Sequence, residues 1–184
     1  MLGKLGRFLD RIGIDMSKLV LHPNAILRRR ADSVEAIDSV ILSLVAEMIH
    51  VMREEQGLGI AAPQVGASKR IFVTEGEAED GGDEKVFINP KFLVVDGLLE
   101  SYEEGCLSLP DIRGTVRRQP HVIIEALDVH GKTFTMEESG LMARCWQHEM
   151  DHLDGVLIID RMSVIDRIVN RKRLRALEST GDSD

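Results

Sequence analysis

The chain has 184 residues, of which 43% are hydrophobic and 29% are charged, so its composition is that of a single globular domain and excludes a largely disordered chain. Its formal net charge of −8 argues against broad binding to nucleic acid. No run is long and apolar enough to predict a membrane span, and the first residues lack the apolar stretch of a secretory signal. With only two cysteines no disulfide framework is expected, and we predict a cytoplasmic protein that does not contact membranes.

Apolar residues at helical spacing predict several helices. The first such pattern covers residues 2–12 and predicts either a short helix packed on the body or a disordered arm. Residues 36–55 repeat apolar side chains with helical period and are followed by two glycines, which end the helix. Helical spacing returns at residues 141–153 and at residues 163–177, where the predicted helix is basic on one side.

A strand pattern occupies the middle of the chain. Apolar and β-branched runs predict strands over residues 70–74, 86–89, 92–100 and 121–129. The acidic, glycine-containing segment 75–84 is typical of an exposed loop. The order of helix, strands, helix and helix indicates an α+β fold rather than a doubly wound α/β fold.

The helix predicted over residues 141–153 contains the pattern H-E-x-x-H, formed by His148, Glu149 and His152. Histidines four positions apart lie on one helical face, so both imidazoles can reach one cation. Glu149 can take a proton from a metal-bound water, because the cation lowers the pKa of that water from about 16 towards about 7. A surface helix with two unrelated histidines is the alternative. We predict a metal-dependent hydrolase.

A catalytic site of this kind needs a third protein ligand and one open position. An extended zinc-protease pattern would use position 158, which is Ile158 and cannot bind metal, and the downstream glutamate, Glu178, lies near the chain end. Cys145 shares the helical face of the histidines but is about 10 Å along the axis from the second one, so we expect it to pack or to line a pocket. Cys106, which follows a predicted strand and a glycine, could approach the helix from a neighbouring strand.

The segment from Gly57 to Gly66 reads GLGIAAPQVG and includes G-x-G-x-x-A, a pattern found in dinucleotide-binding folds. That pattern must follow a strand and open a helix, whereas here a predicted helix precedes it and Pro63 would fall in the first turns of a new one. We interpret it as a tight segment whose small residues let a substrate backbone approach. Gln64 either satisfies nearby backbone, which the residues alone favour, or supplies an amide donor.

The segments GLGIAAPQVG, EGCLSLP and QHEMDHLDG, in this order, resemble the three signature motifs of the peptide deformylases. The flanking chain also resembles the bacterial form, including HPNAILRRRA and INPKF, so the resemblance spans about residues 19–163. It implies a hydrolase that removes the formyl group from N-formyl-methionyl nascent peptides and releases formate. It also implies an N-terminal extension (1–16), a catalytic domain (17–163) and a C-terminal helix and tail (164–184), with mixed or antiparallel sheets packed around the H-E-x-x-H helix.

The same resemblance implies a role for each motif residue. It makes Glu149 the general base and assigns donation to the oxyanion to Gln64 and to the backbone N–H of Leu107. The implied metal ligands are Cys106, His148 and His152. The implied substrate-binding residues are Gly59 and Gly105, which pair with the peptide backbone, and Leu58, Leu141 and Cys145, which line the methionine pocket. The implied cofactor is Fe²⁺, and Zn²⁺, Ni²⁺ or Co²⁺ can occupy the site.

Two further expectations concern charged residues. Arg118 and Asp151 either orient the metal-binding histidines, which usually donate their second N–H to a partner, or form a plain surface ion pair. Residues 161–178 contain six basic and two acidic side chains, which suggests docking on ribosomal RNA near the exit of new chains. The alternative is a solvated helix packed on the body. We expect a monomer.

Two rival functions also fit the metal motif. A zinc endopeptidase would cleave internal peptide bonds and would need a third ligand downstream of His152, where Ile158 removes the obvious one. A structural metal site without catalysis would be closed by four protein ligands. Only three good candidates are present, and Glu149 would then have no purpose.

Overall fold

The structure is a computed structural model that describes residues 19–76 and 84–181. The helix or arm predicted over residues 2–12, and most of the acidic loop predicted over residues 75–84, lie outside the described residues. Among the described residues, no helix is both long enough and apolar enough to cross a membrane.

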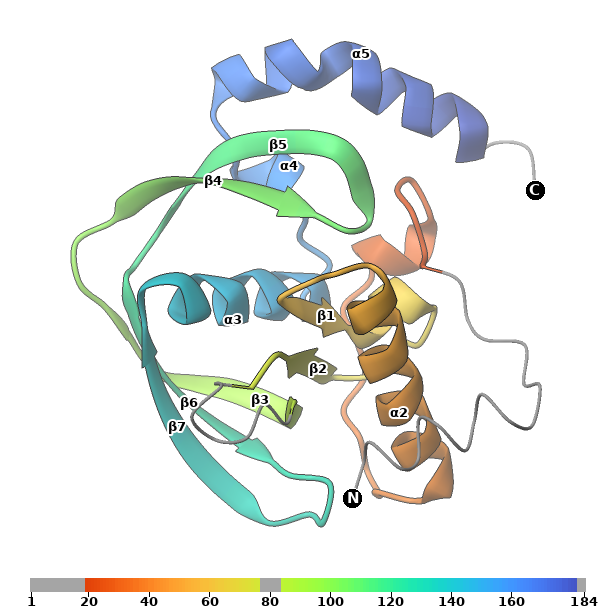
Figure 1. Ribbon diagram of the computed structural model, residues 1–184, viewed down its shortest axis with the longest axis vertical. Helices are drawn as coiled ribbons and strands as arrows, with labels where there is room; N and C mark the ends of the chain where they lie inside the picture. The colour runs from red at the N-terminus through yellow and green to blue at the C-terminus, as the bar shows by residue number, and fades with distance from the viewer. Residues whose placement is uncertain (1–18, 77–83, 182–184) are drawn as a thin grey trace.

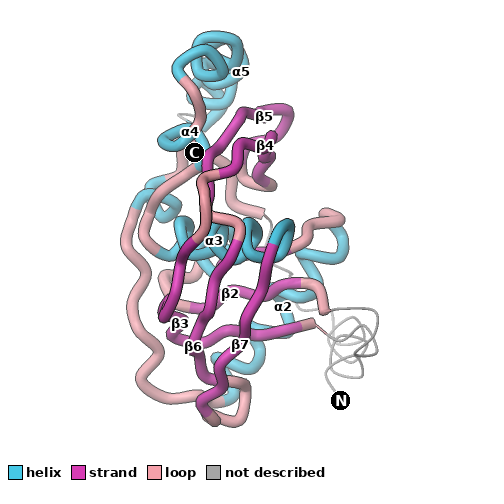
Figure 2. The backbone as a smooth tube through the Cα atoms, turned by 90° about the vertical axis from the view of Figure 1, so that its left-hand side faces the viewer, coloured by secondary structure: helices cyan, strands magenta, loops and turns pink. Residues whose placement is uncertain are grey.

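Two antiparallel sheets carry most of the chain. The larger sheet has the spatial order β1 (Gly59–Ala61), β2 (Ile71–Thr74), β3 (Lys85–Asp96), β6 (His121–Leu127) and β7 (Thr133–Ser139). The smaller sheet is a hairpin of β4 (Glu100–Cys106) and β5 (Leu109–Arg118). Figure 2 shows β3, β6 and β7 side by side, with the β4–β5 hairpin at the far end of the same view.

The helices lie around and between these sheets. They are α2 (Ser39–Glu54), α3 (Gly140–Leu153), α4 (Ile158–Arg161) and α5 (Val164–Gly181), with 3₁₀ turns η1 (Ala25–Arg28) and η2 (Ala62–Val65). Figure 1 shows α3 between the larger sheet and the β4–β5 hairpin, and α5 along the outer side of the hairpin. Helix α3 is therefore central, with a different sheet on each side.

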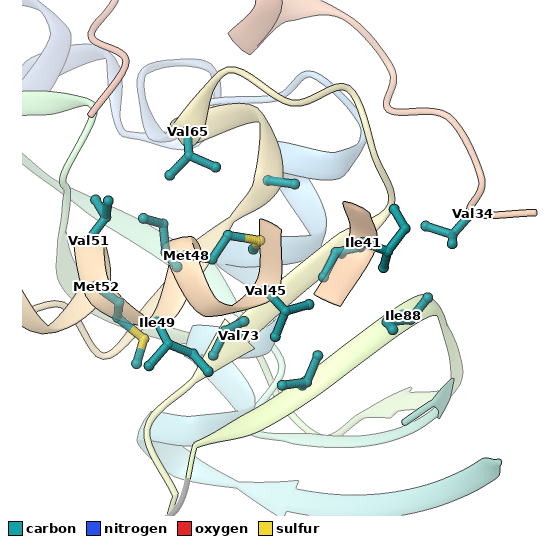
Figure 3. Packing of buried hydrophobic residues seen from close by; sticks show 14 residues of the cluster. Val34, Ile41, Val45, Met48, Ile49, Val51, Met52, Val65, Val73 and Ile88 are labelled. Carbon is teal, nitrogen blue, oxygen red and sulfur yellow. The ribbon is translucent and has the colours of Figure 1, made fainter. Parts of the chain in front are cut away.

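Helix α2 covers one face of the larger sheet. It begins after Asp38, whose side chain accepts hydrogen bonds from the backbone N–H groups of the first turn and so caps the helix. Its apolar stripe packs on the strands, and Figure 3 shows Met48 and Ile49 of α2 beside Val73 of β2. This cluster excludes water from one face of β1, β2 and β3.

Helix α3 covers the opposite face of the same strands. Gly140, at a φ of 61°, turns the chain directly from β7 into the helix. Trp146 of α3 packs against Phe87 of β3 with ring centroids 5.0 Å apart, and Phe87 stacks on Phe72 of β2 at 4.4 Å. The apolar flank of α3 is thus fixed on the sheet by a compact aromatic cluster.

The structure confirms the α+β class, the antiparallel sheets and the C-terminal helix. The helices predicted over residues 36–55, 141–153 and 163–177 are present as α2, α3 and α5, with ends shifted by a few residues. The segment Gly57–Gly66, predicted only as tight, contains the edge strand β1 and the turn η2, and no long helix follows it.

Two strand predictions were wrong in their bounds. The predicted strands 86–89 and 92–100 are one strand, β3, which ends at Asp96, and β4 begins at Glu100. Pro90 lies between the two predicted strands, and β3 accommodates it at an irregularity in its pairing with β6, next to Asn89 at a φ of 51°. A proline lacks the N–H that a regular ladder needs, so such an irregularity tolerates it. Strands β4, β5 and β7 were missed because charged residues and threonines fill much of them.

Candidate metal centre

The candidate centre lies where α3 faces the β4–β5 hairpin. The rings of His148 and His152, one turn apart on α3, have centroids 5.0 Å apart. Cys106 ends β4 and places its Sγ 3.2 Å from His152 Nε2. One donor atom from each of these three residues lies within 4.8 Å of the other two. The sequence-predicted ligands therefore converge, although they come from two separate elements.

This donor set fits a divalent transition metal. One thiolate and two imidazoles suit Zn²⁺, Fe²⁺, Ni²⁺ or Co²⁺ better than Mg²⁺ or Ca²⁺, which prefer oxygen. Three protein ligands also leave a position for water or substrate, as in catalytic rather than structural sites. The arrangement of Cys106, His148 and His152 thus fits the metal that the motif predicts.

Glu104 connects His148 to the protein, and sequence reasoning missed it. Its Oε2 lies 3.2 Å from His148 Nδ1, which leaves Nε2 of that ring for a cation. Its two oxygens also accept hydrogen bonds from Arg118, at 2.8 and 2.9 Å. A carboxylate that holds the second nitrogen of a ligating histidine fixes the ring orientation. The signal in the sequence was its place in the segment EGCLSLP, two residues before Cys106.

Arg118 and Asp151 complete a buried network around Glu104. Arg118 is 4% exposed, which excludes a plain surface ion pair. Its Nη1 donates to Asp151 Oδ2 at 2.8 Å, and its other nitrogens hold Glu104. Arg118 therefore reaches the candidate ligand His148 through Glu104 and not directly.

Arg144 anchors the same carboxylate from α3 itself. Its Nη1 donates to Glu104 Oε1 at 2.6 Å, and the guanidinium also donates to the backbone carbonyls of Val116 and Glu100. The guanidinium lies 5.0 Å from the centre of the Tyr102 ring. Helix α3 and the hairpin are thus joined by directional bonds.

The electrostatics of this cluster favour an ionised Glu104. Burial works to raise the pKa of Glu104, but hydrogen bonds from His148 and Arg118 outweigh it and hold that pKa well below its usual range. Burial works to lower the pKa of His148, but hydrogen bonding with Cys106 and Glu104 raises it to about 10. A cation bound at His148 would displace that proton, so metal binding releases it.

The other two titratable residues of the motif are shifted by burial. Burial raises the pKa of Glu149 to about 7, against the opposing charges of His148 and Arg118. Burial and the neighbouring charge of His148 lower the pKa of His152 well below its usual value. His152 is therefore a neutral imidazole, the form that binds metals, and Glu149 can both accept and release a proton near neutral pH.

Gln64 satisfies nearby backbone, the role that the residues alone favour, and its role as an amide donor stays a prediction. It is 1% exposed on η2, and its Oε1 accepts a hydrogen bond from the backbone N–H of Ala61 at 2.9 Å. Its Nε2 points to the other side, 3.2 Å from Ser108 Oγ and 3.8 Å from Cys106 Sγ. One end of the amide satisfies backbone while the other presents N–H groups beside the candidate metal ligands.

A cavity of about 500 Å³ opens over the centre. It is lined by the proposed base and ligands Glu149, His148 and Cys106, by Gln64 and Leu107, and by all five residues predicted to bind substrate, Leu58, Gly59, Gly105, Leu141 and Cys145. His152 does not line the cavity and lies deeper, at 1% exposure. The predicted binding residues are thus neighbours in space, although they come from three distant segments.

Gly59 and Gly105 both line the cavity, but they differ in the space available for a side chain. A Cβ atom at Gly59 would lie 2.8 Å from both Cys145 Sγ and Glu149 Oε1, which is too close, so β1 approaches α3 only because residue 59 lacks a side chain. A Cβ atom at Gly105 would meet nothing closer than the Arg113 side chain at 3.7 Å. Packing within the described residues therefore explains Gly59 but not Gly105.

Comparison with known proteins finds relatives along most of the chain. The family model of polypeptide deformylase matches residues 16–167. A peptide deformylase of Hahella chejuensis is 44% identical over 161 residues, covering 86% of this chain and 95% of the relative. One of Acidobacterium capsulatum is 40% identical over 165 residues, covering 89% and 96%. The solved structure of a peptide deformylase from Plasmodium falciparum has a TM-score of 0.85 at 37% identity, covering 90% of this chain and 98% of that one.

Proposed function

The chain belongs to the polypeptide deformylase family, and we propose that the cavity over α3 is the site of its reaction. It is a hydrolase that removes the N-formyl group from newly synthesised polypeptides. The observation that carries the assignment of the site is the convergence of Cys106, His148 and His152 beside Glu149, under a cavity large enough for a side chain. Each of these residues, with its neighbours in the cavity, then has a separate role.

Cys106, His148 and His152 are proposed to hold Fe²⁺, for which Zn²⁺, Ni²⁺ or Co²⁺ can substitute. When bound, the cation supplies Lewis acidity that polarises the formyl oxygen and acidifies water. A thiolate beside ferrous iron is sensitive to oxygen and peroxide, so we expect activity to decay in air faster with Fe²⁺ than with Ni²⁺. Equal decay rates for the two metals would count against the thiolate–iron assignment.

Glu149 is proposed as the general base and then the general acid. Its carboxylate takes a proton from the attacking water and delivers it to the leaving amine, and a pKa raised to about 7 suits both steps. Gln64 Nε2 and the backbone N–H of Leu107 donate to the oxygen that becomes negative. Each such donor is typically worth about 3 kcal/mol in the transition state.

Substrate binding is proposed to use both edges of the cavity. Leu58, Leu141 and Cys145 surround the methionine side chain, and Gly59 and Gly105 pair with the peptide backbone. β1 is the edge strand of its sheet, so it can accept an extended peptide. The small residues beside Glu149 leave room for a formyl carbon, which carries only hydrogen, and exclude bulkier acyl groups.

The test is formate release from a formyl-Met peptide by anaerobically prepared protein loaded with Fe²⁺ or Ni²⁺. Glu149→Ala is the control, because it removes the base but none of the three proposed ligands. We expect release by the wild type and loss in the variant with metal still bound. Unchanged turnover in Glu149→Ala would overturn the assignment of the base. Turnover that survives a Cys106→Ala, His152→Ala double variant lacking metal would overturn the assignment of the centre.

We also propose that the protein works as a cytoplasmic monomer that docks on ribosomal RNA through α5. The support is a row of exposed basic side chains on that helix, at Arg167, Arg171, Lys172, Arg173 and Arg175. Charge reversal at Arg171, Lys172 and Arg173 is expected to weaken co-sedimentation with ribosomes, in a salt-dependent manner. Reversal at the exposed residues Arg29, Lys91 and Lys132 is the matched control. Equal co-sedimentation of both triple variants would refute the docking.

A further inference from the structure

Besides Nδ1 of the candidate ligand His152, three buried polar atoms on α3 and β2 have no hydrogen-bond partner within the described part of the chain. They are Thr74 Oγ1, Trp146 Nε1 and Glu149 Oε2. The three residues are 0%, 1% and 3% exposed. Buried polar atoms in native proteins are nearly always paired, either with protein or with ordered water. We therefore expect these three atoms, which lie at one interface, to belong to one hydrogen-bonded group.

The alternation of β2 directs Thr74 toward α3. Val73 packs in the cluster on the α2 side of the sheet, whereas Phe72 packs in the cluster that contains Trp146 on the α3 side. Successive side chains of a strand point to opposite faces. Thr74 therefore shares the face of Phe72 and lies under α3.

The pairing of β1 with β2 then places Thr74 beside the proposed base. Gly59 is the residue directly opposite Thr74, and side chains of opposite residues share a face of the sheet. A Cβ atom at Gly59 would lie 2.8 Å from Glu149 Oε1 and 3.0 Å from Glu149 Cγ. Gly59 has no side chain, so residue 59 places no side-chain atom between Thr74 and Glu149.

Trp146 approaches the same position from the other side. Its ring packs on Phe87 of β3, and it precedes Glu149 by three residues, so the two side chains project from the same side of α3. Strand β2 lies between β1 and β3. Thr74 on β2 therefore lies between Glu149, which is over β1, and Trp146, which is over β3.

The chemistry of the three groups is complementary. An indole N–H only donates, an ionised carboxylate only accepts, and a hydroxyl does both. We propose that the Thr74 hydroxyl accepts from Trp146 Nε1–H and donates to Glu149 Oε2 through ordered water, because neither pair is bonded directly. Thr74 is then a positioning residue that fixes one oxygen of the base and leaves Oε1 turned toward the cavity. This inference rests on the proposed role of Glu149.

The first measurement separates kcat from KM in two matched variants. Thr74→Val keeps the shape and removes the hydroxyl, and Thr74→Ser keeps the hydroxyl and removes a methyl group. In the Zn²⁺-loaded enzyme we expect Thr74→Val to lower kcat about tenfold with little change in KM, since one hydrogen bond to an ionised group is lost. Thr74→Ser is expected to stay near the wild type. Equal losses in both variants would indicate a packing role and overturn the proposal.

The second measurement does not depend on turnover. Trp146 is the only tryptophan of the chain, so its indole N–H gives one side-chain resonance in the ¹H–¹⁵N spectrum of the Zn²⁺-loaded protein. We expect that resonance to move in Thr74→Val and to stay in Thr74→Ser. If it does not move, or if it moves while kcat is unchanged, the proposal fails. If Thr74→Val does not fold, the wild-type protein supplies the test. An indole N–H resonance at the position of an indole without a hydrogen bond would then overturn the proposal.

These two measurements test the Thr74 proposal separately from the proposed role of Glu149. An active Glu149→Ala variant would remove the base assignment whatever the indole shows. A wild-type indole spectrum in Thr74→Val would remove the hydrogen-bonded chain even if Glu149 is the base.

Discussion

The two flanks of α3 are both buried but are held by different forces. The flank on the larger sheet presents Trp146 and Met150 to Phe72 and Phe87 in an apolar cluster, beside which Arg70 Nη2 lies 3.4 Å from Met150 Sδ. The flank on the β4–β5 hairpin is a network of buried charges around Glu104. One helix thus has an apolar side and an ionic side, and the candidate metal ligands belong to the ionic side.

The two kinds of contact control different properties of the site. Apolar burial has little directional preference, so it determines how closely the helix lies on the sheet and how stable that contact is. Charge-assisted hydrogen bonds are directional, so they determine how His148 is turned. Truncations on the apolar flank should therefore lower stability, and truncations on the ionic flank should also disturb metal binding.

The largest expected effect is on the apolar flank. Phe87→Ala removes a fully buried ring that contacts both Phe72 and Trp146, and it should lower the free energy of unfolding by about 3–5 kcal/mol. Phe134→Ala, at the half-buried margin of the cluster, is the control and should cost less. Denaturant unfolding measures both, and Zn²⁺ affinity of the folded Phe87→Ala protein should stay close to the wild-type value. A large loss of Zn²⁺ affinity in Phe87→Ala would show that the apolar flank also controls metal binding.

Glu104→Gln should affect both stability and metal binding. The variant keeps the shape but loses the charge that Arg118 and Arg144 face, and it should lower the free energy of unfolding by about 3 kcal/mol at pH 7. Its Zn²⁺ affinity should fall about 10- to 100-fold, because His148 loses its anionic partner. Competition with a chelator measures the affinity.

The stability difference between wild type and Glu104→Gln should depend on pH. Since the pKa of Glu104 is held well below its usual range in the fold, its charge stabilises the protein above the ordinary carboxyl pKa of about 4.3. That contribution is lost as the pH falls further toward the lowered pKa of the folded state. Unfolding curves of the metal-free proteins should therefore converge below about pH 4. Parallel curves over this range would contradict the assigned ionisation.

The smallest effect is expected at the margin of the ionic flank. Arg161 pairs with Asp151, but its side chain is 45% exposed, so solvent screens the pair. Arg161→Ala should change the free energy of unfolding by less than about 1 kcal/mol and leave kcat unchanged. An effect as large as that of Glu104→Gln would show that the outer pair is as important as the buried one.

Local patterns predicted the parts of the site that lie close together in the sequence. The helical period predicted α2 and α3, and the spacing of His148 and His152 on one helix indicated a cation. The convergence of Cys106 with these histidines was only an open possibility from the residues, because 46 residues separate Cys106 from His152. The resemblance to a family supplied that ligand, and the fold now shows the proximity.

Other features could not be predicted, because they depend on contacts between elements. Glu104 meets Arg144 across 40 residues of sequence, and a carboxylate beyond the end of the strand predicted over residues 92–100 has no local mark that it will be buried. Pro90 lies inside β3, and a proline at an irregularity of a strand is indistinguishable in sequence from one that ends a strand. The direction of Thr74 required the register of β1 with β2.

The two origins of the ligands have a mechanical consequence. Cys106 is on the hairpin, whereas His148 and His152 are on α3, so an ion held by all three acts as a cross-link that closes a loop of the chain. Closing such a loop restricts the unfolded chain, as a disulfide does. We therefore expect the metal-loaded protein to resist proteases better than the metal-free protein. The β4–β5 hairpin should be the first segment to be released when the ion leaves.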